Sequence, residues 1–162
     1  MAGASVPFVD LHARASSAVR GIRTGTLATV AMSAVMLAAK RVGLTGELPP
    51  MTITDAAADK MPVGFRPPER DRGALASVMH FAFGGLAGGL YGILAKDVVR
   101  VVPGALLGIL FASGIYAVSY LGWVPALSIL PPAHRDRPGR VGTMLVAHWA
   151  YGALLGALTA RR

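Results

Sequence analysis

The sequence predicts an all-α integral membrane protein, a four-helix bundle built from two similar helical hairpins. Three observations predict this fold: the composition is strongly apolar, the charges leave four long uncharged windows, and the second and fourth windows share a motif. Of the 162 residues, 54% are hydrophobic and only 15% are charged, and the mean hydropathy is +0.55. A soluble domain carries about 25% charged residues. The absence of Cys also excludes a disulfide-rich secreted scaffold.

Each uncharged window predicts one crossing of the membrane. The windows lie at 24–39, 73–95, 101–133 and 141–160. A helix rises about 1.5 Å per residue, so about 20 apolar residues cross a hydrocarbon core of about 30 Å. The last three windows are long enough, and the first is extended by Arg23 and Lys40, whose long side chains can reach the interface. Four crossings would put both termini on one side.

The windows divide the chain into a tail and two hairpins. We expect a polar N-terminal tail at 1–20, a first hairpin at 21–95 and a second at 96–162. The spans are expected at about 22–40 and 73–95, then at about 102–123 and 141–160, with an interfacial helix near 54–60. Because only a short turn separates the second and third spans, we expect these two to be antiparallel neighbours.

The second and fourth spans share a nine-residue motif. The segment from His80 to Gly88 reads HFAFGGLAG and the segment from His148 to Gly156 reads HWAYGALLG, with five identical positions. Each expected hairpin also holds a Leu-Pro-Pro sequence, at 48–50 and 130–132. These matches predict an internal duplication, with the two hairpins related by a pseudo-two-fold axis along the membrane normal.

Small residues in the motif predict which helix faces pack together. Gly84, Gly88 and Gly92 recur every four residues in one span, and Gly152 and Gly156 do so in the other. Such spacing lets helix backbones approach closely in a bilayer. His80 and His148 each lie four residues before the first glycine, so both imidazoles should look into the bundle, about 10 Å from the same membrane face.

We therefore predict an intramembrane polar site around the two histidines. Tyr116, entering from the opposite face, would reach a similar depth and is the expected hydroxyl partner of a histidine. The candidate site consists of His80, His148, Tyr116, Ser113 and Ser33.

Three roles fit such a site. In a structural role, neutral histidines hydrogen-bond across the bundle and hold the hairpins in register. In a second role, the histidines, Thr29 and the three hydroxyl residues above line a path for a neutral solute in a small transporter or channel. In a third role, the two imidazoles bind a haem iron from both sides. No other cofactor, no metal site and no catalytic residues are predicted, because the spans lack Cys and acidic partners.

The basic loop before the last span predicts contacts outside the hydrocarbon core. Its candidate residues for lipid headgroups or for a partner's acidic segment are His134, Arg135, Arg137 and Arg140. A solvated anchor for the adjoining helices is the alternative interpretation. Besides the lipid bilayer, we expect a membrane-protein partner or a second copy of the chain. Nucleic acid is not expected, because the basic residues flank helix ends instead of lining one face.

The paired prolines and the histidine motif resemble the YagU-like group of uncharacterised four-helix bacterial inner-membrane proteins. The matching positions are Pro49-Pro50, His80 with Phe83, Pro131-Pro132, and His148 with Trp149. The sequence departs from that pattern at 144–147, which hold no acidic residue. The resemblance implies an inner-membrane location and no established activity.

The predicted protein is thus a multi-pass protein of the bacterial inner (plasma) membrane, an embedded accessory or structural protein without catalytic chemistry. Both termini are expected in the cytoplasm, because Arg14, Arg20 and Arg23 precede the first span and basic residues favour the cytoplasmic side.

Overall fold

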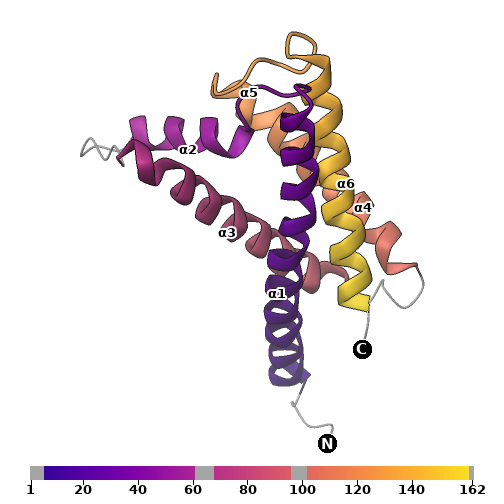
Figure 1. Ribbon diagram of the computed structural model, residues 1–162. Helices are drawn as coiled ribbons and strands as arrows, with labels where there is room; N and C mark the ends of the chain where they lie inside the picture. Colours follow the sequence, from indigo (N-terminus) through magenta and orange to yellow (C-terminus); the bar gives the residue numbers. More distant parts are fainter. Residues whose placement is uncertain (1–5, 61–67, 96–101, 161–162) are drawn as a thin grey trace, which may run out of the picture.

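The computed structural model is all-helical in the residues it describes, which are 6–60, 68–95 and 102–160 (Figure 1). The helices are α1 (Val6–Arg41), α2 (Pro49–Asp59), α3 (Glu69–Ala95), α4 (Gly104–Val118), the π-helix η2 (Ser119–Trp123), α5 (Val124–Ala126) and α6 (Pro138–Ala160). Four stretches are long and apolar enough to cross a membrane, and they are Leu11–Arg41, Glu69–Ala95, Gly104–Ala126 and Pro138–Ala160. The predicted fold class, an all-α four-helix membrane bundle, is confirmed.

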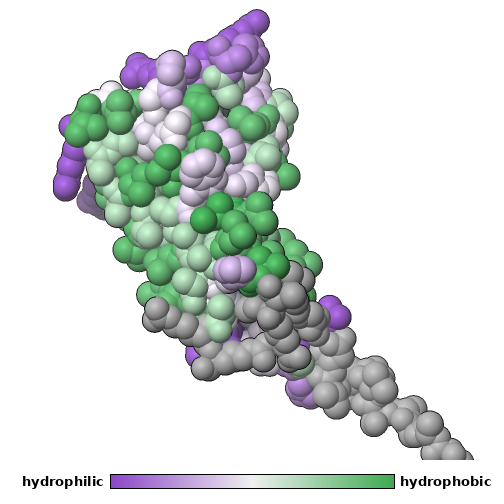
Figure 2. Space-filling model, turned by 90° about the vertical axis from the view of Figure 1, so that its right-hand side faces the viewer, coloured by the Kyte–Doolittle hydropathy of each residue, from purple (hydrophilic) through white to green (hydrophobic). Residues whose placement is uncertain are grey.

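The outer surface of the bundle is apolar, as a lipid-facing surface must be. Figure 2 shows a broad hydrophobic region below a hydrophilic end on the face that it displays. Leu86 on α3, Leu110 on α4 and Val146 on α6 all expose about half of their surface or more. In water such exposure would be costly, whereas in a bilayer these side chains contact acyl chains.

Helix α1 begins far earlier than its expected span. It starts at Val6, so most of the expected polar tail at 1–20 is helical, and the helix extends beyond the rest of the bundle (Figure 1). Its 36 residues measure about 54 Å, well above the thickness of a hydrocarbon core. Alanine and arginine are frequent in the early turns, and both are good helix formers, so the helix continues where the apolar window ends.

Glycine faces pair α1 with α3. Gly21 and Gly25 of α1 lie against Gly88, and the Thr29 side chain lies over Gly84. A Cβ added at Gly88 would lie 2.6 Å from the Gly25 Cα, closer than real side chains approach. The predicted packing glycines of α3 therefore allow direct backbone contact with α1.

A second glycine face pairs α4 with α6. Gly104 and Gly108 of α4 lie against Gly156 and Gly152 of α6. These contacts match those of the first pair. Gly84 and Gly152 stand at equivalent positions of the shared motif, and so do Gly88 and Gly156. Each of these four glycines lies against a glycine of the partner helix. The two Leu-Pro-Pro segments differ, because only the first one starts a helix. The duplication itself stays a prediction.

The expected packing of the second span along the third is wrong. Helix α3 packs along α1, α4 packs along α6, and α1 also contacts α6. Helices α3 and α4 meet chiefly near the turn that joins them, where the Tyr91 hydroxyl donates to the Gly104 carbonyl over 3.3 Å and the Tyr91 ring lies 5.3 Å from that of Phe111. Complementary glycine faces, and not the short connection, decide which helices pair.

Helix α2 begins earlier than the expected 54–60 helix, and it braces α3. Pro49 and Pro50 occupy its first turn, where the missing N–H of proline leaves no hydrogen bond unmade. Asp55 of α2 forms a bidentate ion pair with Arg72 of α3, whose Nε lies 3.0 Å from Oδ1. This pair holds α2 across the first turns of α3.

The π-helix η2 lies between α4 and α5. The Val124 N–H donates to the Ser119 carbonyl, five residues back. Pro125 follows, and in an α-helix its ring would collide with the carbonyl four residues earlier. The wider π turn relieves this collision, and π turns often occur at functional sites. Here the turn carries Tyr120 and Trp123 toward the interior pocket.

Candidate functional site

A pocket of about 300 Å³ lies between the helices, and it is the best candidate for a functional site. α3 and α2 supply the largest shares of its wall, and α1, α6, the end of α4, η2, α5 and Leu130 complete it. In Figure 1, α2 and α3 lie to one side of α1 and α6 lies to the other. The wall is mostly apolar and includes Met32, Met36, Met79 and Met144. Methionine side chains adapt to ligands of varied shape.

His148 of α6 lines this pocket and is 8% exposed. Its Nδ1 lies 2.7 Å from the carbonyl oxygen of Met144 on the same helix. A carbonyl only accepts hydrogen bonds, so Nδ1 must carry the proton, and in the neutral imidazole Nε2 then carries the lone pair. The neutral form of His148 therefore offers Nε2 to the pocket as an acceptor.

His80 of α3 lines the same pocket, as the shared motif predicts. Its Nε2 is buried and has no hydrogen-bond partner among the described residues. The ring lies edge-on to Phe81, with centroids 6.1 Å apart. A buried polar atom without a partner costs about 1–3 kcal/mol. An imidazole left in this state is suited to a ligand that completes its hydrogen bonding.

The other predicted site residues lie around the pocket and do not line it. Tyr116 contacts His148 through its ring, with centroids 5.3 Å apart and planes at 70°, and it stacks on Tyr120. Ser113 donates to the Ile109 carbonyl and accepts from Trp149 Nε1 over 3.0 Å. Ser33 is half-buried on α1 and is not part of the wall. The predicted bond between the Tyr116 hydroxyl and a histidine is not found among the described residues; Tyr116 meets His148 through a ring contact, and His148 Nδ1 bonds to a carbonyl of its own helix.

Two tyrosines of the wall were not among the predicted site residues. Tyr151 is buried, and its hydroxyl donates to the Gly84 carbonyl over 2.6 Å, which joins α6 to α3. Tyr120 donates to Asp136 over 2.5 Å from the η2 turn. Tyr151 stands in the shared motif three residues after His148, and that position would have marked it as inward-facing.

The basic loop contains a buried ion pair, so Arg140 is not a solvated anchor. Arg140 Nη1 lies 3.0 Å from Asp136 Oδ1, and the two side chains are 11% and 2% exposed. Asp136 also accepts from the Arg137 N–H over 2.7 Å. Pro138 starts α6 just after this aspartate, so the helix returns Arg140 to it after one turn. His134 and Arg135 are exposed, as a surface loop predicts.

The described residues offer no group of three or more His, Asp or Glu side chains that could hold a metal ion. The site chemistry visible in the described residues is therefore hydrogen bonding from two imidazoles inside an apolar wall.

Comparison with known proteins gives a family. Residues 15–162 match the model of DUF6789, a family of unknown function. The chain belongs to this family. No curated protein and no solved structure matches it. The resemblance to the YagU-like group stays a prediction, since the DUF6789 match carries no link to that group.

Proposed function

We propose that this DUF6789 protein is a non-catalytic binding protein of the bacterial inner membrane, which holds a small apolar molecule with one hydroxyl or carbonyl group in the pocket between α1, α3 and α6. One observation carries the proposal: both motif histidines line a single apolar pocket, and His80 Nε2 is buried there without a partner. The pocket volume of about 300 Å³ lies at the small end of the range of ligand pockets.

The hydrogen bonds of the bundle argue against a purely structural role for the histidines. The bond made by His148 stays within α6. Other side chains join the helices: Tyr151 donates to Gly84, Trp149 donates to Ser113, and Thr24 on α1 bonds to Thr159 on α6 over 3.0 Å. Helix register is thus held without either imidazole.

The pocket also argues against a continuous path for a neutral solute. Of the residues expected along such a path beside the histidines, only Thr29 lines the pocket, and its hydroxyl is already bonded to the Gly25 carbonyl over 2.8 Å. Ser33, Ser113 and Tyr116 lie outside the wall. Retention of a ligand fits this arrangement better than passage through the bilayer.

A pair of probes of equal shape tests the binding function. We expect 4-tert-butylphenol to raise the thermal unfolding midpoint of the detergent-purified protein, and 4-tert-butyltoluene, which lacks the hydroxyl, to raise it much less. The His148→Leu variant should bind the phenol about tenfold more weakly, because a hydrogen bond to a buried acceptor contributes about 1.5 kcal/mol. The His12→Leu variant, changed on an exposed part of α1, should bind like the wild type. Equal binding of both probes, or an unchanged affinity in His148→Leu, would contradict the proposal.

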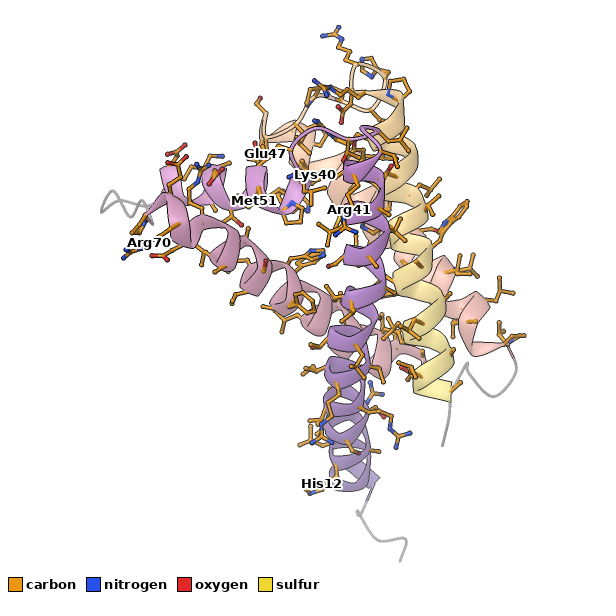
Figure 3. All side chains as sticks on the ribbon, viewed as in Figure 1. His12, Lys40, Arg41, Glu47, Met51 and Arg70 are labelled. Atoms are coloured by element: carbon orange, nitrogen blue, oxygen red, sulfur yellow. The ribbon has the colours of Figure 1, made fainter. Side chains whose placement is uncertain are left out.

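For orientation we propose that the beginning of α1 and the end of α6 face the cytoplasm. Both lie at one end of the bundle in Figure 1, and Figure 3 shows His12 at that end and Glu47 near the opposite one. The chain has no Cys, so a single introduced cysteine reports its own side. In intact cells with a permeable outer membrane, a charged maleimide should label Glu47→Cys and spare His12→Cys. The reverse pattern would overturn this orientation.

A further inference from the structure

Two guanidinium groups converge at the end of the bundle where α1 ends and α6 begins. A Cβ built on Gly46, in the α1–α2 connection, would lie 3.2 Å from Arg137 Nη1 and 3.3 Å from Arg140 Nη2. Both guanidinium groups therefore approach the Gly46 backbone more closely than a side chain at this position would readily allow. The first turn of α6 lies close by, because Gly139 packs against the backbone of Leu44.

The polar groups around this space are under-satisfied. Arg140 Nε is buried and has no hydrogen-bond partner in the described part of the chain, and the same holds for Thr45 Oγ1. Thr45 is 5% exposed and directly precedes Gly46. Buried polar atoms are almost always bonded, so two orphans in adjacent elements indicate a missing acceptor.

Asp136, Arg137 and Arg140 together carry a net charge of +1. Arg137 and Arg140 contribute two positive charges, and Asp136 contributes one negative charge. The Asp136 carboxylate already accepts hydrogen bonds from Arg140, the Arg137 N–H and the Tyr120 hydroxyl. Within the described part of the chain the Arg137 guanidinium forms no ion pair, and Arg137 is exposed. Guanidinium groups prefer planar or tetrahedral oxyanions that accept several hydrogen bonds at once.

We propose that Arg137, Arg140 and the Thr45-Gly46 segment form a binding site for a phosphate group. The phosphate oxygens complete the bonding of the two guanidinium groups and neutralise the uncompensated charge. The site lies at the end of the spans, at the depth where phospholipid headgroups meet the protein, so the group belongs either to an anionic lipid or to free phosphate. This site is separate from the apolar pocket and does not depend on the function proposed for it.

Binding to detergent-purified full-length protein tests the site. The probes are short-chain phosphatidic acid, phosphatidylcholine with the same chains, and inorganic phosphate, each titrated while the thermal unfolding midpoint is recorded. We expect phosphatidic acid to stabilise the wild type in a saturable way and phosphatidylcholine to do so far less. Saturable stabilisation by inorganic phosphate of similar affinity would identify free phosphate as the source, whereas stabilisation by phosphatidic acid alone would identify the lipid headgroup.

Two variants that leave the buried ion pair intact locate the site. Arg137→Gln removes one guanidinium, and Gly46→Ala displaces both guanidinium groups without changing the charge; each should weaken binding about tenfold or more. Arg135→Gln, in the same loop and equally exposed, should weaken it less than about twofold, and His148→Leu should leave it unchanged. Circular dichroism must report wild-type helix content for each. The proposal fails if neither phosphatidic acid nor phosphate stabilises the protein, or if Arg137→Gln and Gly46→Ala bind like the wild type.

Discussion

Replacing Gly108 with alanine is expected to destabilise the bundle by about 3 kcal/mol, the upper end of the usual cost of overfilling a packed core. The added Cβ would lie 2.9 Å from the Gly156 backbone nitrogen and still nearer to the Gly152 carbonyl. Because both contacts are backbone atoms, no rotamer change can relieve them. The crossing of α4 with α6 must open, and the close backbone packing that holds helices together in lipid is lost.

Gly114→Ala is the matched control on the same helix. No atom of a neighbouring element lies within 4 Å of a Cβ at Gly114, and the position is exposed. Alanine is a better helix former than glycine by about 1 kcal/mol, so this variant should be as stable as the wild type or more so. Unfolding by increasing mole fractions of sodium dodecyl sulfate measures both, with tryptophan fluorescence as the signal; Trp149, one of the two tryptophans, bonds to Ser113 across the α4–α6 pair. Equal stability of the two alanine variants would contradict the glycine crossing.

The sequence predicted the spans well because the cost of burying charge in lipid is large and local. It predicted helix pairing less well. Gly21 precedes Arg23 and so lies outside the uncharged window that defined the first span. Gly104 and Gly108 lie outside the histidine motif that predicted the packing faces. The four-residue spacing of these glycines was visible in the sequence, and it would have indicated that α1 and α4 carry faces complementary to α3 and α6.

The candidate site was predicted in part. The motif brought His80 and His148 to one pocket because a four-residue spacing fixes a helix face wherever the helix lies. Serine positions could not be predicted in the same way, since a serine in a lipid-embedded helix can bond to the carbonyl four residues back, as Ser113 does. Pro125 lies within the third span, and the π turn that brings Tyr120 to the wall depends on how the chain accommodates this proline.

The buried aspartate gives the second large expected effect. Asp136→Ala should cost about 3–5 kcal/mol, the range found when one partner of a buried ion pair is removed. The loss leaves the Arg140 charge without its counter-ion and the Tyr120 hydroxyl without its acceptor. Asp71→Ala is the control, because its pair with Arg70 is exposed, with 55% of the Asp71 side chain accessible, and exposed pairs contribute at most about 1 kcal/mol. Unfolding in the same detergent series compares the two.

A double variant separates loss of attraction from burial of an unpaired charge. If the unpaired guanidinium causes most of the damage, Asp136→Ala combined with Arg140→Met should be more stable than Asp136→Ala alone, since methionine fills a similar volume without charge. The expected recovery is about half of the loss, because the Tyr120 hydroxyl still lacks its acceptor and that loss is common to both variants. Additive losses would instead mean that Arg140 gains little from Asp136, and its partner would then have to be sought among the anions of the membrane surface.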